Sequence, residues 1–151
     1  MVRGKLKTTI PVLSPEWSLK MTYKVTGTFS SWCSVLRVEQ NADGNDYGKR
    51  TPAIFWRNDL KVATFASAVS GNKNFEKRVN IYPGTVYHVE FHQRYKSAGV
   101  YHYWIVLNGV EIESVDNTQA KQFHNVKVWT SDPNYHACIG TISDFEITNF
   151  L

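Results

Sequence analysis

Three segments of the sequence carry polar side chains, and in one case a tryptophan, on the face opposite their apolar residues. Apolar residues at every second position mark the buried side of a strand, so the residues between them face outward. By this parity the outward residues are Arg37, Glu39, Glu76, Arg78, Asn80, Lys127 and Trp129. An indole stacks on the C–H face of a pyranose ring, and planar polar groups bind its hydroxyls. These residue types predict a carbohydrate-binding face, and an ordinary polar sheet face with one partly covered tryptophan is the alternative.

A loop rich in Asn, Asp and Gly offers a candidate metal site. Asp43, Asn45 and Asp46 place oxygen side chains close together, and Ca²⁺ needs several oxygen ligands. The EF-hand pattern is not met, because its glycine is displaced and its bidentate glutamate is missing. A hydrophilic turn is therefore favoured over a calcium site, and no other cofactor is expected.

Two further sets of residues share a strand face at two-residue spacing. His88, Glu90 and His92 lie about 6.6 Å apart in succession, and two histidines so placed can share a metal. Glu111 and Glu113 resemble the paired carboxylates of a glycosidase. A third metal ligand is missing, and a solvated strand or hairpin explains both sets. Since the sequence also has no recognisable catalytic triad or phosphate loop, it predicts a protein that is not an enzyme.

The elements that must position these residues are β-strands. Alternating apolar residues and turn signals predict strands at 17–25, 32–39, 53–58, 62–70, 75–82, 125–130 and 141–150. In 32–39, the parity directs Trp32, Leu36 and Val38 toward the core. Residues 116–123 predict a single helical turn with Asp116 as its cap. About ten short strands with almost no helix indicate a β-sandwich or barrel.

Residues 82–115 predict a three-stranded antiparallel meander. Asn108-Gly109 is a strong hairpin signal, because both central residues of a type I′ turn need positive φ. A two-residue turn sets Leu107 opposite Val110 and Ile105 opposite Ile112, so that all four share one apolar face. Such a meander is not stable alone and must cover a second sheet.

Length, charge and cysteine content limit the classes of function. A chain of 151 residues predicts a single domain, 1–151, and a net charge of +4 with scattered Lys and Arg argues against nucleic acid as a partner. No apolar run approaches the roughly 18 residues of a membrane span, so membrane insertion is not expected. No signal peptide is visible, which indicates either a cytosolic chain or a mature secreted domain. Cys33 and Cys138 form either one disulfide or two buried thiols.

The chain resembles the concanavalin A-like lectin and glucanase superfamily, meaning galectin-like or laminin-G-like jelly rolls. The resemblance lies in PG-x-x-Y-x-V-x-F at residues 83–91, in V-L-N-G at 106–109 and in IGTISDFEI at 139–147. It implies an all-β fold, a two-sheet antiparallel β-sandwich. By analogy with galectins, one sheet would hold 34–39, 53–58, 62–70, 75–81 and 125–130, with its polar face outward as a shallow groove. The strands at 17–25 and 141–150 are expected in the same sheet.

The resemblance also implies a binding site and a setting for it. The glycan-binding residues would be Arg37, Arg57, Asn74, Glu76, Arg78, Asn80, Lys127 and Trp129. The galectin pattern H-x-N-x-R followed by W-x-x-E-x-R is absent, so galactoside specificity is not implied. The fold brings early and terminal strands together, which favours the Cys33–Cys138 bridge. We therefore predict a secreted, extracellular, non-catalytic module that binds a glycan or glycoprotein. The alternatives are an adhesion or assembly module that binds protein, with homo-oligomers through its edge strands, and a glycoside hydrolase.

Overall fold

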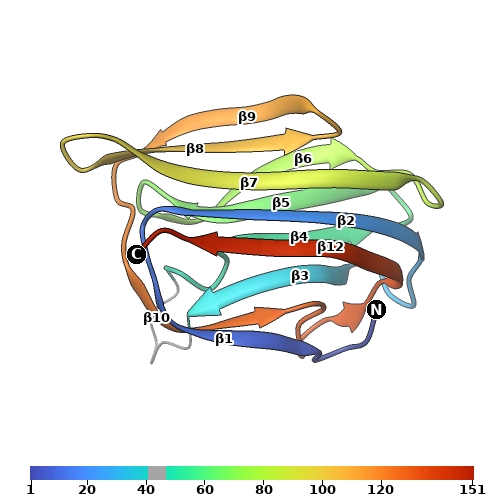
Figure 1. Cartoon of the computed structure of the whole chain (residues 1–151). Helices are drawn as coiled ribbons and strands as arrows, with labels where there is room; N and C mark the ends of the chain where they lie inside the picture. Colours follow the sequence, from blue (N-terminus) through green and yellow to red (C-terminus); the bar gives the residue numbers. More distant parts are fainter. Residues whose placement is uncertain (41–46) are drawn as a thin grey trace.

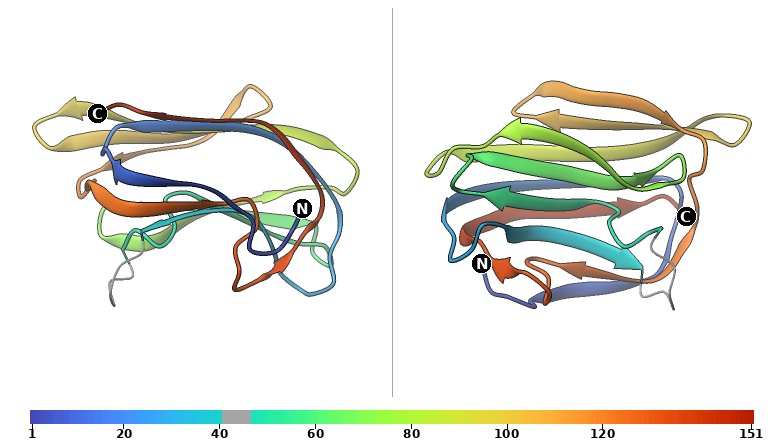
Figure 2. Two further views of the ribbon diagram at one scale, coloured as in Figure 1. Left: turned by 60° about the horizontal axis from the view of Figure 1, so that its bottom comes forward. Right: turned by 180° about the vertical axis from the view of Figure 1, so that it is seen from behind.

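The computed structural model describes residues 1–40 and 47–151, which form two antiparallel sheets packed face to face (Figure 1). Figure 2 shows the sheets as two separate layers. Sheet A has the order β1 (Leu6–Leu13), β10 (Phe123–Trp129), β3 (Cys33–Gln40), β4 (Ala53–Arg57), β5 (Val62–Val69) and β6 (Asn72–Asn80), with β11 (His136–Ala137) parallel to β3. Sheet B has the order β12 (Ile139–Asn149), β2 (Trp17–Gly27), β7 (Val86–Ser97), β8 (Val100–Leu107) and β9 (Val110–Asn117).

This arrangement confirms the predicted β-sandwich. The five strands expected to form the groove sheet all lie in sheet A, and the first long strand pairs with the last one in sheet B. The helical turn predicted at 116–123 is wrong, because β9 continues to Asn117 and no described residue is helical. No apolar helix long enough to cross a membrane occurs in the part of the chain that the structure describes.

The core fills the space between the two sheets. On β2 the alternating residues from Trp17 to Val25 are at most 2% exposed, so this strand turns one full face inward. From sheet A the largest inward side chains are Trp56 and Phe65, both fully buried. The buried indole of Trp56 donates its N–H to the Ile81 carbonyl oxygen at 2.9 Å, so its polar atom is satisfied. Because the apolar faces meet here, the opposite face of sheet A remains available for a site.

The hairpin β8–β9 departs from the predicted register after its turn. Leu107 pairs with Val110 as predicted, but Ile105 pairs with Glu113 and not with Ile112. Val106 pairs with Glu111, so Ile112 is an extra residue without a partner on β8, which is a β-bulge. Ile112 still packs against the core, as predicted, while Val110 beside the turn is 63% exposed. The predicted pairing of Ile105 with Ile112 is therefore wrong, whereas Ile105, Leu107 and Ile112 do share the core-facing side, and Val110 is the exposed member of the four.

A second bulge changes the direction of Trp32. Ser34 pairs with Phe55 and Leu36 with Ile54, so Val35 is the extra residue in β3. The bulge reverses the parity of the residues before it relative to those after it. Trp32, predicted to face the core together with Leu36, instead projects from the outer face of sheet A.

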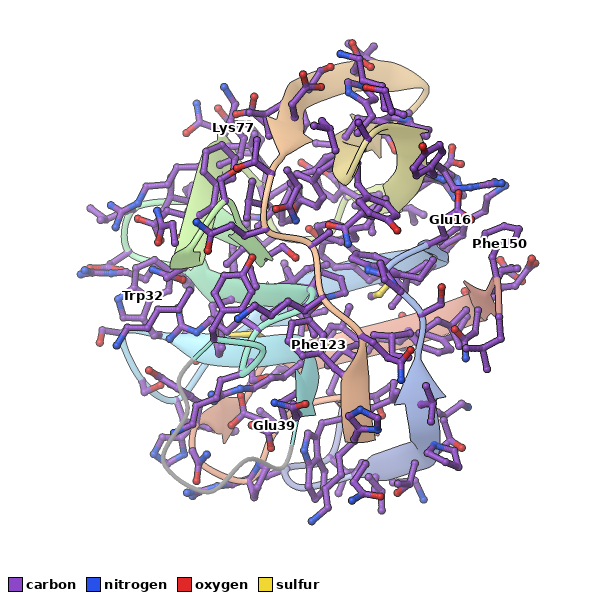
Figure 3. The ribbon with its side chains drawn as sticks, turned by 90° about the vertical axis from the view of Figure 1, so that its left-hand side faces the viewer. Glu16, Trp32, Glu39, Lys77, Phe123 and Phe150 are labelled. Atoms are coloured by element: carbon purple, nitrogen blue, oxygen red, sulfur yellow. A yellow bond between two sulfur atoms is a disulfide. The ribbon has the colours of Figure 1, made fainter. Side chains whose placement is uncertain are left out.

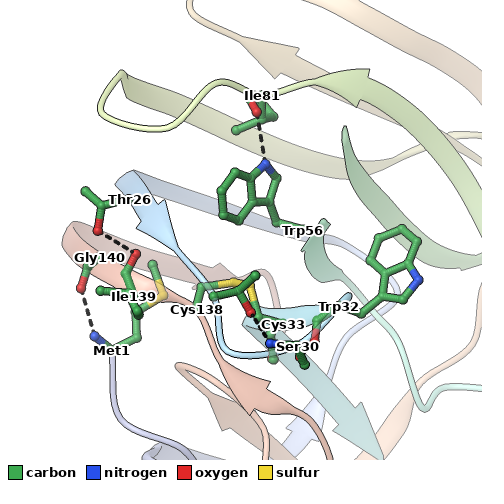
Figure 4. Close-up of a disulfide and its surroundings, with 12 residues drawn as sticks. Met1, Thr26, Ser30, Trp32, Cys33, Trp56, Ile81, Cys138, Ile139 and Gly140 are labelled. Atoms are coloured by element: carbon green, nitrogen blue, oxygen red, sulfur yellow. Dashed lines mark hydrogen bonds between the residues drawn. A yellow bond between two sulfur atoms is a disulfide. The ribbon is translucent and has the colours of Figure 1, made fainter. Parts of the chain in front are cut away.

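A disulfide joins the two sheets near one end of the sandwich (Figure 4). Cys33 begins β3, Cys138 directly precedes β12, and their Cα atoms lie 4.9 Å apart. Next to it, Gly140 has φ +154°, and a Cβ there would collide with the Lys24 carbonyl oxygen. The close pairing of β12 with β2 at this point therefore requires glycine.

Candidate functional site

The register of sheet A arranges its outward side chains in rows that cross the strands. One row runs through Arg78, Thr64, Phe55 and Ser34, and the next through Glu76, Ala66, Ala53, Arg37 and Trp129. The two alanines of the second row, Ala66 and Ala53, have short side chains and are fully buried. Larger side chains from the strands and the surrounding loops rise around them.

A hollow of about 190 Å³ lies on this face, and we call its lining the arginine–aromatic groove. Its residues are Trp32, Arg50, Phe55, Thr64, Glu76, Arg78 and Tyr135. Strands β4, β5 and β6 supply Phe55, Thr64 and the Glu76/Arg78 pair. The other three come from segments that precede β3, β4 and β11. Figure 3 shows Trp32 on the outer side of sheet A, away from sheet B.

Aromatic rings and guanidinium groups alternate along the groove. The Arg50 guanidinium lies 4.8 Å from the centre of the Phe55 ring, and Tyr135 packs against the same ring at 4.9 Å. Trp32 is faced by Arg57 at 5.5 Å and by Arg78 at 5.9 Å. A cation over an aromatic face is attracted by the ring quadrupole. These contacts hold the guanidinium planes in defined orientations at the surface.

Thr64 places an unsatisfied hydroxyl at the floor of the groove. The residue is 3% exposed, and its Oγ1 has no hydrogen-bond partner among the described residues. A buried hydroxyl without a partner costs about 1–3 kcal/mol, and such groups in native proteins are normally satisfied by protein, water or ligand. A polar ligand that reaches the floor of the groove would supply the missing partner.

A second hollow of about 270 Å³ adjoins the groove and shares Arg50 with it. Its described lining residues are Arg37, Lys49, Arg50, Lys73 and Asn74, so all of its charged described residues are basic. Arg37 is only 8% exposed, and its Nε donates to the Lys49 carbonyl oxygen at 2.9 Å. Arg37 also pairs with Glu39 at 3.2 Å and with the buried Asp132 at 3.7 Å. It thus holds neighbouring segments in place and presents little surface itself.

Four of the residues predicted from sequence lie in or beside the groove. Glu76 and Arg78 line it, and Asn74 accepts a hydrogen bond from Arg50 Nη1 at 2.6 Å. Arg57 is clamped by Asp59 through bonds of 3.0 and 2.6 Å, and these hydrogen bonds hold the pKa of the Asp59 carboxyl below its usual value. Asn80 lies farther along β6, exposed, in the row of Arg57.

Trp129 and Lys127 form a separate cluster at the other side of Arg37. The Trp129 indole donates its N–H to Glu39 Oε1 at 2.9 Å, and the Lys127 ammonium lies 5.9 Å from the Trp129 ring centre. Trp129 pairs with Arg37 in the β10–β3 register, but it does not line either hollow that the structure describes on this face. We call Trp129, Lys127 and Glu39 the Trp129 cluster.

Sequence reasoning missed five residues of the groove: Trp32, Arg50, Phe55, Thr64 and Tyr135. A bulge hides the outward direction of Trp32, and Arg50 and Tyr135 come from loops, where alternation does not apply. Phe55 was ambiguous because all of Ala53–Trp56 is apolar. Its direction could have been read from Arg57, since residues two apart on a strand share a face.

The candidate metal sites find no support among the described residues. Asp43, Asn45 and Asp46 lie outside these residues. In the described ranges no group of three or more His, Cys, Asp or Glu is placed to hold a metal ion. His88 and His92 instead share hydrogen bonds of 2.7 and 2.8 Å with hydroxyls of β2. Glu111 and Glu113 lie on β9, in the sheet that does not carry the groove.

Comparison with known proteins identifies the fold. No family model matches the sequence, and no curated protein matches it significantly. A SAP-like pentraxin from Limulus polyphemus is similar in structure, with a TM-score of 0.59 and 12% identity over 94% of this chain and 67% of that chain. Sheep galectin-11 has a TM-score of 0.52 and 11% identity over 98% of this chain and 99% of its own. The alginate lyase Aly36B has a TM-score of 0.55 and 14% identity over 99% of this chain and 76% of its own. The chain thus has the concanavalin A-like jelly-roll fold, and identities this low show the fold alone.

Proposed function

We propose that this chain is a non-catalytic, lectin-like module that binds carbohydrate in the arginine–aromatic groove. The observation that carries the proposal is the composition of the groove: aromatic rings, oriented guanidinium groups and an unsatisfied hydroxyl around one hollow. Rings offer stacking surface to the C–H face of a sugar, and the polar groups offer hydrogen bonds to its hydroxyls. Galectins and alginate lyases among the similar structures are, by their names, proteins that engage saccharides, which agrees with this proposal.

The carboxylates of the groove favour binding over hydrolysis. Glycoside hydrolysis generally uses two carboxyl groups, about 5–5.5 Å or 6.5–9.5 Å apart on either side of the scissile bond. Glu76 is the one carboxylate among the described residues of the groove, and it is paired with Arg78 at 3.5 Å. Incubation of the protein with the polysaccharides it binds should therefore release no hydrolysis products, and the non-catalytic proposal also predicts no unsaturated ends, which a lyase would produce. Release of either would contradict the non-catalytic assignment.

The disulfide supports an extracellular setting for this activity. Disulfides persist in oxidising compartments and are rare in the cytosol, where thiols are kept reduced. The Cys33–Cys138 bridge is thus consistent with a secreted module whose natural partners are glycans or glycoproteins.

Two tryptophan variants test where the sugar binds. Trp32→Ala removes an aromatic wall of the groove, and Trp129→Ala removes the ring of the Trp129 cluster. Both residues are half-buried on the same sheet face, so each variant controls for the other. On a glycan array followed by titration calorimetry, we expect Trp32→Ala to lose about 5- to 150-fold in affinity, as the loss of stacking contacts worth about 1–3 kcal/mol implies.

Trp129→Ala should retain the affinity of the parent chain. The opposite result would move the site to the Trp129 cluster. Full affinity in both variants, with native far-ultraviolet spectra, would contradict binding on this face altogether.

A further inference from the structure

Arg50 differs from Arg78 in the groove and from Arg57 beside it, because each of those two is paired with a carboxylate. Arg78 pairs with Glu76 at 3.5 Å and Arg57 with Asp59 at 2.6 Å. Arg50 contacts an amide oxygen of Asn74 and the face of Phe55, which are both neutral. Among the described residues, no carboxylate lies within ion-pair distance of Arg50. Within the described residues, the charge of Arg50 thus has no counter-charge where the two hollows meet.

The surroundings of Arg50 make this charge a strong site for an anion. The side chain is half-buried, so its charge is less screened than that of an arginine in open solvent. The Phe55 ring and the Asn74 amide fix the guanidinium plane and engage one nitrogen, and further N–H donors remain for a ligand. A planar guanidinium fork matches the geometry of a carboxylate or sulfate better than a lysine ammonium does.

Thr64 provides a second, independent indication of a ligand beside Arg50. Its buried hydroxyl lines the same hollow and has no protein partner in the described structure. A hydroxyl can donate to an anion or accept from a sugar hydroxyl, so either part of an acidic sugar would satisfy it. The aromatic side chains Trp32, Phe55 and Tyr135 line the same hollow, where a pyranose ring could pack.

We propose that the groove selects acidic saccharides, in which a pyranose carries a carboxylate or sulfate group that pairs with Arg50. This inference rests on the proposed carbohydrate-binding function and names its ligand class. Neutral saccharides bind the same groove more weakly, because they leave the Arg50 charge without a counter-charge.

The test compares three hexasaccharides by titration calorimetry: a neutral glucan, an oligogalacturonate and a heparin-derived sulfated oligosaccharide. Arg50→Gln removes the charge, and Arg94→Gln is the matched control. Arg94 lies on β7 in sheet B, is also partly exposed, and also stacks on an aromatic ring, Phe150, at 3.8 Å. Both substitutions change the net charge of the chain by the same amount. Arg50→Lys keeps the positive charge but loses the planar guanidinium. If Arg50→Gln lowers the melting temperature, Arg50→Lys becomes the variant that tests whether Arg50 recognises the anion.

We expect at least one acidic hexasaccharide to bind about tenfold tighter than the neutral one, with weaker binding at high salt. Arg50→Gln should remove most of this preference and Arg50→Lys part of it, while Arg94→Gln leaves it intact. The preferred acidic ligand identifies the anion as carboxylate or sulfate.

Equal affinity for neutral and acidic ligands would overturn the inference and leave the proposed function standing. An equal loss in Arg50→Gln and Arg94→Gln would also overturn it, since that would reflect net charge alone. Absence of binding to all three ligands, and to any glycan on an array, would overturn the proposed function as well.

Discussion

Replacing Thr64 with valine separates a hydroxyl that serves a ligand from one that serves the fold. Thr64 is 3% exposed on β5, and its Oγ1 has no partner in the described structure. Threonine and valine have nearly the same shape, and both are β-branched, so the strand and its packing should not change. The substitution exchanges a hydroxyl for a methyl group at the floor of the groove.

The expected changes in stability and binding have opposite signs. A buried hydroxyl without a partner costs about 1–3 kcal/mol, and we take the low end because the groove opens to water. The free energy of unfolding should therefore rise by about 1 kcal/mol. For a chain of this size that corresponds to roughly 2–4 °C in melting temperature. Loss of one hydrogen bond to the ligand, about 0.5–1.5 kcal/mol, should weaken saccharide binding by about two- to tenfold.

Calorimetric melting and ligand titration of the same protein sample measure both effects. Thr22→Val is the control, because Thr22 lies on β2 in the other sheet and its hydroxyl bonds His88 Nδ1 at 2.7 Å. It should leave binding unchanged. A drop of 1 kcal/mol or more in the stability of Thr64→Val would show that the hydroxyl has a structural partner. Unchanged affinity would show that it does not reach the ligand.

Three further predictions concern the disulfide, the acidic residues of segment 41–46 and the buried tyrosines. Replacing Cys33 and Cys138 together with serine should lower the free energy of unfolding by up to about 4.8 kcal/mol in urea titrations, because the bridge closes a loop with a sequence separation of 105. A loss below about 1 kcal/mol would contradict a stabilising bridge. If Asp43, Asn45 and Asp46 form a plain hydrophilic turn, EDTA and excess Ca²⁺ should leave the melting temperature unchanged, whereas a calcium-dependent rise would indicate a bound ion. Burial raises the pKa of Tyr23 and Tyr103 above the usual value of 10.0, so above that pH the unfolded chain releases protons that the native chain keeps. Stability should then fall as pH rises past about 10, by up to about 1.4 kcal/mol per pH unit for each tyrosine, and a flat profile in urea titrations up to about pH 11.5 would refute this.

The sequence was informative wherever a pattern is repeated along one strand. Unbroken alternation in 17–25 predicts a half-buried strand, and β2 spans Trp17–Gly27 with its apolar face in the core. Asn108-Gly109 predicts the β8–β9 turn, and both residues have positive φ, 48° and 79°. These features depend on local sterics and on burial of one strand face, which neighbouring residues encode directly.

Resemblance to a superfamily supplied the next level, the assignment of strands to sheets. Sheet A contains all five strands expected to carry the groove, and β12 pairs with β2 in sheet B. Alternation alone cannot assign strands to sheets, because it shows which face of a strand is buried but not which other strand pairs with it.

Only the tertiary structure decided how the groove is composed. Bulges at Val35 and Ile112 each insert one residue, which reverses the strand parity of the residues before it relative to those after it. The first of them turns Trp32 outward. Arg50 and Tyr135 reach the groove from loops, which cross-strand pairing and long-range packing place around Phe55. Alternation with a period of two describes a strand only between bulges and loops. The sequence by itself therefore determined the strands, the two-layer fold and the polar outer face of one sheet. Three-dimensional packing determined which side chains meet on that face.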